Sequence, residues 1–244
     1  MRKFGLIGKK LGHSFSKRYF TEKFQREGIQ DAVYELYELP AAQDLAKLLQ
    51  QDPELVGLNV TVPYKEEVIP LLDELDQAAA SIGAVNTIRI RNGRSKGFNT
   101  DYVGFKSSLE QFYPQAERGQ ALVLGTGGAA KAVWAALDAL SIPFVKVSRS
   151  PQQNELGYEQ LTPERLQDYN LLVNTTPLGM YPKVDNCPSV PYESLTAQHY
   201  LYDLVYNPEE PLFLRKGAKV GAKTMNGLPM LYQQADAAWD IWNG

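Results

Sequence analysis

The sequence contains little cysteine and little histidine: one cysteine, Cys187, and two histidines among 244 residues. A single cysteine excludes an internal disulfide framework, and so few soft ligands leave little material for a transition-metal site. We therefore expect no metal centre. Any redox chemistry must come from a bound cofactor.

Long hydrophobic runs and a strong charge of one sign are also missing. The apolar N-terminal segment turns polar at Lys9, which makes it too short for a signal peptide, and no run approaches membrane-spanning length. The net charge of −3 provides no basic field for nucleic acid. These absences predict a cytoplasmic protein with neither a membrane nor a nucleic acid as partner.

Strand and helix patterns alternate from residue 1 to about 101 and again from 121 to about 222. Such alternation predicts the α/β class with mostly parallel sheets, here two α/β domains. We assign residues 1–101 to a first domain and residues 102–226 to a Rossmann-type second domain. The apolar helix that opens after Gly227 is expected to pack back on the first domain, so 227–244 belong with it.

The hydrophobic pattern of the first domain predicts individual strands and helices. Strands are expected at 4–8, 33–39 and 56–62, and helices at 41–50, from a cap at Ser16 to a stop at Gly28, and from about Pro63 onward.

A glycine-rich turn joins a strand to a helix in the second domain. Gly125-x-Gly127-x-x-Ala130 fits the dinucleotide fingerprint, in which the phosphates lie on the free N–H groups of the helix N-terminus. We expect Gly125, Thr126, Gly127, Gly128 and Ala129 to contact the cofactor. An ordinary structural turn is the alternative.

The next strand, 144–148, ends in Ser148-Arg149-Ser150. An NAD-binding unit usually has an acidic residue there for the ribose 2′-hydroxyl, whereas a guanidinium with two hydroxyls suits a 2′-phosphate. The cofactor is therefore predicted to be NADP. A solvated arginine at a strand end is the alternative.

Polar groups also interrupt the third strand of the first domain. Asn59 and Thr61 lie two residues apart and share a strand face. If a helix begins near Pro63, Lys65 falls in its first turn, where the helix dipole lowers the pKa of a lysine and suits it to proton transfer. A solvated lysine paired with Glu66 or Glu67 explains the pattern equally well.

A hairpin follows, with Asn92-Gly93 as a type I′ turn. Its register would place Asn86 opposite Asn99 and near Asp101, but it also opposes Arg91 to Arg94. Asp101 precedes a helical run and can equally be an N-cap.

Two more strands, 171–176 and 200–206, end in residues that should lie where ligands of doubly wound sheets bind. These residues include Thr175, Leu204 and Tyr206. Gln234, on the last helix, is expected at the surface unless it faces the cleft.

Taken in order, these motifs resemble the shikimate dehydrogenase family over essentially the whole chain. The stretches that carry the resemblance are His13-Ser14-Phe15-Ser16, 59–66, 83–87, 99–101, 125–130 and 227–234.

The resemblance implies NADPH-dependent reduction of 3-dehydroshikimate to shikimate, with Lys65 and Asp101 as the catalytic pair. It implies a substrate site formed by Ser14, Ser16, Asn59, Thr61, Asn86, Tyr206 and Gln234. It also implies that Leu204 and Gly227 border the nicotinamide. Thr175, at the carboxyl end of its strand, is expected at the cofactor site.

The chain departs from the family at several points. The family's second phosphate-binding arginine is Gln153, and the methionine near the nicotinamide is Leu204. A quinate/shikimate dehydrogenase using NAD or NADP therefore stays open, as does a catalytically silent nucleotide sensor. The sequence leaves both a monomer and a homodimer open.

Overall fold

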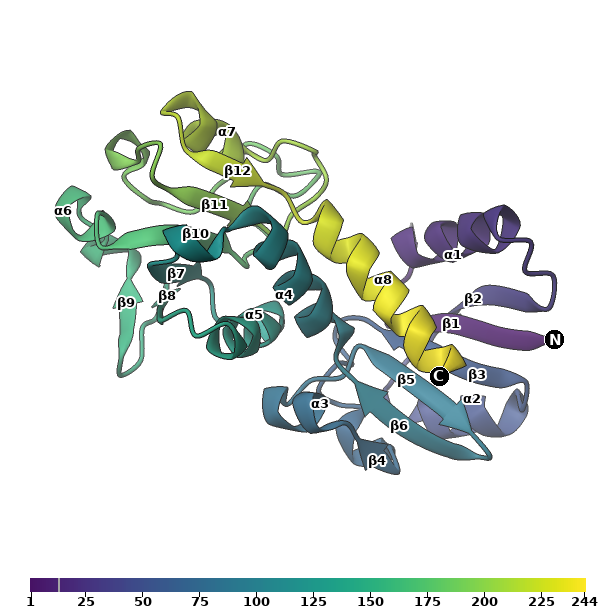
Figure 1. Cartoon of the computed structure of the whole chain (residues 1–244). Helices are drawn as coiled ribbons and strands as arrows, with labels where there is room; N and C mark the ends of the chain where they lie inside the picture. The colour runs from purple at the N-terminus through teal and green to yellow at the C-terminus, as the bar shows by residue number, and fades with distance from the viewer. Residues whose placement is uncertain (13) are drawn as a thin grey trace. The chain divides into compact units, whose positions relative to one another are not determined.

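The computed structural model describes residues 1–12 and 14–244, which form two compact units (Figure 1). One unit comprises Met1–Thr100 with Ala235–Gly244, and the other comprises Asp101–Gln234. Each contains one six-stranded sheet. The predicted α/β class is confirmed. No helix in the described ranges is long and apolar enough to cross a membrane.

The first unit is built on a sheet of order β2-β1-β3-β5-β6-β4, in which β1, β2 and β3 run parallel. Its elements are β1 (Arg2–Gly8), α1 (Phe15–Arg26), β2 (Ala32–Glu38), α2 (Asp44–Gln51), β3 (Leu55–Val60), the 3₁₀ turn η1 (Ile69–Leu71), β4 (Glu74–Leu75), α3 (Gln77–Ile82), β5 (Thr87–Arg91) and β6 (Arg94–Phe98).

Helices cover both faces of this sheet. On one face, Phe20 and Phe24 of α1 pack with Phe4 and with Trp242 from the last helix, α8 (Leu228–Asn243). On the other face, residues of α2 and α3 pack on β1, β3 and β5. The last helix therefore returns to the first unit, as predicted.

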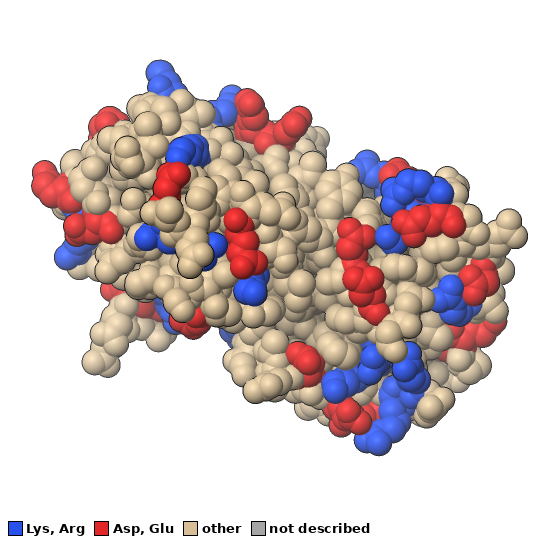
Figure 2. All heavy atoms as spheres, viewed as in Figure 1, with Lys and Arg blue, Asp and Glu red and all other residues tan. Residues whose placement is uncertain are grey.

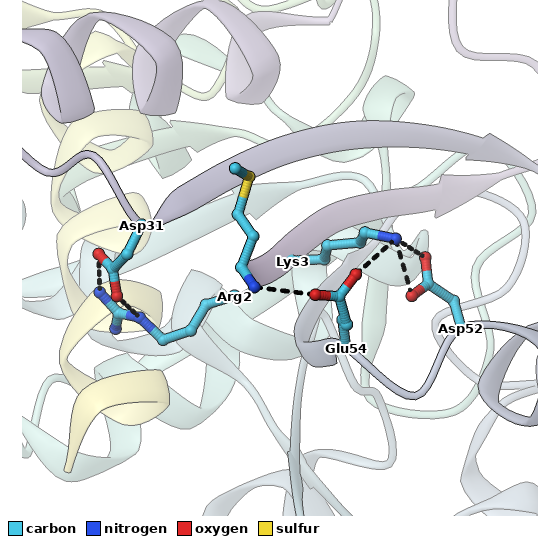
Figure 3. Close-up of polar contacts among 6 residues, drawn as sticks. Arg2, Lys3, Asp31, Asp52 and Glu54 are labelled. Atoms are coloured by element: carbon cyan, nitrogen blue, oxygen red, sulfur yellow. Dashed lines mark hydrogen bonds and ion pairs between the residues drawn. The ribbon is translucent and has the colours of Figure 1, made fainter.

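Ion pairs fix the N-terminal ends of the first strands (Figure 3). The Arg2 guanidinium contacts both carboxylate oxygens of Asp31, at 2.8 and 3.0 Å, while Lys3 contacts Asp52 at 3.0 Å and Glu54 at 3.2 Å. These charges are structural, because parallel strands place their ligand-binding groups at the opposite, carboxyl ends.

The β5–β6 hairpin has the predicted register, with Thr87 opposite Phe98 and Arg91 opposite Arg94. Asn92 and Gly93 both have positive φ, as a type I′ turn requires. Figure 2 shows basic side chains grouped over this hairpin, while elsewhere on that face both signs mix. Glu74 of β4 offsets the like charges, since its carboxylate lies 3.3 Å from Arg94 and 3.7 Å from Lys96.

Several predicted boundaries are wrong. Ser14 rather than Ser16 caps α1, because its hydroxyl accepts from the Lys17 N–H at 3.2 Å. No α-helix follows Pro63: residues 62–68 form turns that lead into η1, so the helix-dipole argument for Lys65 does not hold.

Three strands end earlier than expected. In the first unit β3 ends at Val60, and in the second unit the strands predicted at 171–176 and 200–206 end at Asn174 and Asp203. The helix α2 begins at Asp44, three residues later than expected.

The second unit is a doubly wound sheet of order β12-β11-β10-β7-β8-β9, parallel throughout. Its elements are α4 (Thr100–Phe112), η2 (Gln115–Glu117), β7 (Gln120–Leu124), α5 (Gly128–Ala139), β8 (Phe144–Ser148), β9 (Glu155–Gly157), η3 (Tyr158–Gln160), α6 (Pro163–Leu166), β10 (Tyr169–Asn174), η4 (Tyr192–Ser194), β11 (Tyr200–Asp203), α7 (Leu212–Lys219), β12 (Lys223–Met225) and the start of α8.

Two cores lie on the two faces of this second sheet. One contains Phe105 of α4, Val133 of α5 and Met230 of α8, and the other contains Leu166 of α6 and Phe213 of α7. Helices on both faces bury the strands, and β7 and β10 are almost continuously apolar for that reason.

Candidate active site

A series of buried polar side chains runs through the first unit near the ends of β3 and β5. The Tyr34 hydroxyl donates to Asn59 Oδ1 at 2.7 Å and is also hydrogen-bonded to Ser16. Burial raises the pKa of Tyr34, so this phenol stays neutral and remains a donor. Tyr34 thus joins two predicted substrate residues, and sequence reasoning did not identify it.

The same series continues to the start of α4. Asn59 Nδ2 donates to Thr87 Oγ1 at 3.2 Å, and Thr87 Oγ1 lies 3.0 Å from Thr100 Oγ1. Asn86 Oδ1 accepts from the Thr100 N–H at 2.6 Å, and its Nδ2 donates to Thr100 Oγ1 at 3.0 Å. Asn86 therefore satisfies the first amide of α4.

This contact changes the interpretation of Asp101. The helix starts at Thr100, so Asp101 lies inside its first turn and is not the N-cap. Asn99 donates to the Ala84 carbonyl at 3.0 Å, while the Asn86 side chain bonds Thr100.

Backbone contacts bring Thr61 and Lys65 to the same end of the first sheet. The Thr61 N–H donates to the Ile7 carbonyl at 3.0 Å, which continues the pairing of β1 with β3. The Lys65 carbonyl accepts from the Val85 N–H at 2.7 Å, next to Asn86 in the chain. Thr61, Lys65 and Asn86 are therefore gathered around the carboxyl ends of parallel strands.

Three further residues were predicted to bind the substrate: Ser14, Tyr206 and Gln234. Ser14 caps α1. Tyr206 follows β11 and is 39% exposed, whereas Gln234 is only 8% exposed, which excludes an open surface position and leaves the alternative that it faces the cleft as a prediction. Asp101, Tyr206 and Gln234 belong to the second unit, and the approach of Lys65 to Asp101 stays a prediction. His13 lies outside the described residues.

The second unit contains a cavity of about 700 Å³ at the carboxyl ends of β7, β8 and β10. Seven predicted cofactor residues line it: Gly125, Thr126, Gly127, Ser148, Arg149, Ser150 and Thr175. Residues that were not among the predicted cofactor residues complete the lining: Val147, Tyr158, Thr176, Pro177, Leu178, Cys187 and Ser189. Gly128 and Ala129 open α5 without belonging to the lining.

The glycine turn is suited to an anion. Gly125 has φ +109°, and a Cβ there would come within 2.8 Å of Thr175 Oγ1. Around Gly127 and Gly128 a Cβ would meet nothing within 4 Å, so a ligand can approach the backbone closely. The helix α5 has no side-chain cap and no acidic residue in its first turn, so its N-terminal dipole is available to phosphate.

Leu204 and Gly227 are adjacent but lie outside the lining of the cavity. A Cβ on Gly227 would overlap the Leu204 carbonyl, so only glycine fits there. The Leu204 N–H donates to the Asn174 carbonyl at 3.0 Å, which ties Leu204 to the end of β10. Among the described residues, no three His, Cys, Asp or Glu side chains gather to hold a metal ion.

Comparisons with known proteins agree with these motifs. A family model described as the shikimate dehydrogenase substrate binding domain matches residues 6–88. The shikimate dehydrogenase (NADP(+)) of Desulforamulus reducens is 37% identical over 261 residues, which cover 98% of this chain and 89% of that protein.

Two solved structures are similar over the whole chain. The shikimate 5-dehydrogenase of Thermus thermophilus, in complex with NADP(H) and shikimate, has 32% identity and a TM-score of 0.88, covering 100% of this chain and 94% of that one. The quinate dehydrogenase of Corynebacterium glutamicum, in complex with NAD, has 28% identity and a TM-score of 0.89 at the same coverage. Sequence identity along nearly its full length thus shows that the chain belongs to the shikimate dehydrogenase family.

Proposed function

We propose that this protein catalyses the reversible NADPH-dependent reduction of 3-dehydroshikimate to shikimate, a step of aromatic amino-acid (chorismate) biosynthesis. The observation that carries the proposal is the cavity at the uncapped N-terminus of α5, with Arg149 on its wall. The similar curated proteins are named NADP(+) shikimate dehydrogenases, so the quinate alternative is not favoured.

The second unit is proposed to hold NADP. Its glycine turn and the first amides of α5 would bind the pyrophosphate, and Ser148, Arg149 and Ser150 would hold the 2′-phosphate. Thr175 would line the same site, while Leu204 and Gly227 would border the nicotinamide. Residues 102–226 would thus be the cofactor domain. Residues 1–101 with 227–244 would be the substrate domain.

NADPH, when bound, supplies the hydride that reduces the ketone. Lys65 is proposed to donate a proton to the alkoxide oxygen that forms, and its positive charge would stabilise that oxygen as the charge develops. Asp101 would orient the lysine and accept a hydrogen bond from a substrate hydroxyl. The polar side chains proposed to surround the ring are Ser14, Ser16, Asn59, Thr61, Asn86, Tyr206 and Gln234.

Initial rates test the proposal directly. NADPH oxidation should require 3-dehydroshikimate, and rates with NADH and with quinate should be much lower. Absence of turnover between mildly acidic and alkaline pH would refute it. Faster quinate oxidation with NAD than shikimate oxidation with NADP would instead favour the quinate enzyme.

A lysine variant separates an enzyme from a silent sensor. Lys65→Ala should lower kcat by about 100-fold or more, because a general acid is lost, while NADPH affinity stays unchanged. Lys47→Ala removes an exposed lysine of α2 and serves as the matched control. Equal turnover in both variants would remove Lys65 from the mechanism. We propose a cytoplasmic location, and either a monomer or a homodimer as the assembly.

A further inference from the structure

Asp203, the last residue of β11, is fully buried and has a defined set of hydrogen bonds. Its Oδ1 accepts from Asn174 Nδ2 at 2.9 Å and from the Val205 N–H at 3.0 Å. Burial raises the pKa of this carboxyl to about 7, while the two donors act in the opposite direction. Burying an ionisable carboxyl costs free energy, so we look for a role of Asp203 other than packing.

Asn174 connects Asp203 to the wall of the cofactor cavity through hydrogen bonds. Its Oδ1 accepts from the Thr176 N–H at 3.0 Å and from Thr176 Oγ1 at 2.7 Å. Thr176 Oγ1 in turn accepts from the Leu178 N–H at 3.3 Å. Both Thr176 and Leu178 line the cavity, so the orientation of the Asn174 amide determines where that wall lies.

The same carboxyl also holds the end of its own strand. The Val205 N–H that it accepts from belongs to the segment after β11, and the Val205 carbonyl accepts from the Gly227 N–H at 3.2 Å. The buried Oδ1 of Asp203 thus joins the ends of β10 and β11, in addition to the bond from the Leu204 N–H to the Asn174 carbonyl.

We propose that Asp203 is a positioning residue for NADP(H), which holds the Thr175–Leu178 wall and the Leu204–Val205 segment in the geometry that binds the cofactor. The proposal rests on the proposed function. Asp203 is not among the residues that line the cavity, so it would act through Asn174 and the Val205 amide.

The other carboxylate oxygen makes the proposal testable. Oδ2 of Asp203 is buried and has no hydrogen-bond partner within residues 1–12 and 14–244. An asparagine can therefore keep the accepting Oδ1 and place its amide nitrogen where no bond is lost. Asp203→Asn should bind NADPH within about twofold of the wild type, whereas Asp203→Ala leaves the buried Asn174 amide short of an acceptor.

The experiment is a fluorescence titration of NADPH with steady-state kinetics of the full chain. Asp203→Ala should raise the Kd and KM for NADPH by about tenfold or more, since the Asn174 amide loses the acceptor that orients it and no longer holds the wall in place. The KM for shikimate should change little. If Asp203→Ala does not fold, Thr176→Val replaces it, with an expected loss of about fivefold for one neutral hydrogen bond.

Glu117→Ala is the matched control, because Glu117 holds the other end of β11 by accepting from the Tyr200 hydroxyl at 2.6 Å. It should lower stability without changing the Kd for NADPH. Wild-type affinity in Asp203→Ala, equal losses in Asp203→Asn and Asp203→Ala, or the same loss in Glu117→Ala would each overturn the positioning role. A wild-type chain that binds no NADPH would overturn the proposed function itself.

Discussion

Asp203→Asn should make the protein more stable at alkaline pH and leave its stability almost unchanged at acidic pH. In the folded chain burial raises the pKa of the carboxyl to about 7, whereas an unfolded aspartate has a pKa of about 3.9. Between these two values the folded state binds more protons than the unfolded state. Stability contributed by this group is therefore greatest below about pH 4 and is lost as the pH rises to about 7.

The magnitude follows from the separation of the two pKa values. A difference of about 3 units corresponds to about 4 kcal/mol once the carboxyl is ionised in both states. An asparagine cannot ionise and escapes this cost. The gain in the free energy of unfolding should therefore grow by about 3 kcal/mol between about pH 4.5 and pH 8.

Urea unfolding followed by tryptophan fluorescence would measure this gain at several pH values. Asp73→Asn is a control of opposite sign, because the Ser95 N–H and hydroxyl lower the pKa of Asp73. That variant should lose stability at alkaline pH. A gain for Asp203→Asn that is independent of pH, or a loss at pH 8, would refute the assignment of a raised pKa to Asp203.

Three further substitutions test the two sites. Arg149→Ala should lower the preference of kcat/KM for NADPH over NADH by about tenfold or more, since one charged hydrogen bond contributes about 1.5–3 kcal/mol, and the NADH rate is the internal control. Gly125→Ala should lower stability by about 1–3 kcal/mol in thermal unfolding and weaken NADPH binding, because its φ is +109° and Thr175 Oγ1 lies in the way; unaltered NADPH affinity would contradict the close fit. Tyr34→Phe should raise the KM for shikimate, because Asn59 Oδ1 loses its donor, and an unchanged KM would remove Tyr34 from the site.

Much of the second unit was predictable from sequence because its signals are local. The glycine turn, the strand before it and the strand 144–148 are short-range patterns, and sheet packing preserves them. In the first unit, the register of the β5–β6 hairpin was predictable for the same reason, because Asn92-Gly93 allows few turn geometries.

The turn after β3 was not predictable, because its cause is distant in the chain. Pro63 followed by two glutamates has the composition of a helix start. In the fold, however, the buried Tyr64 donates its hydroxyl to the Leu39 carbonyl at 2.6 Å, and Val68 is fully buried. These tertiary contacts hold the segment in turns instead.

Tyr34 was missed because its role depends on strand order. Its strand, β2, does not pair with β3: β1 lies between them, and the Tyr34 hydroxyl must reach across β1 to Asn59. Alternation along β2 indicates which of its residues are buried. It does not indicate that β3 lies on the far side of β1, which is what brings Tyr34 to Asn59.

In both units, the side chain of a buried asparagine accepts a hydrogen bond from a backbone amide just after a strand ends. Where a strand stops, the next backbone amides lose their sheet partners and need another acceptor. Asn86 Oδ1 accepts from the Thr100 N–H in the first unit, and Asn174 Oδ1 accepts from the Thr176 N–H in the second. Each of these amides adjoins a proposed site residue, Asp101 or Thr175. Because each buried asparagine holds the residue next to a different proposed site, we expect substitution of Asn86 to impair substrate binding and substitution of Asn174 to impair cofactor binding, which separate titrations of the two ligands would measure.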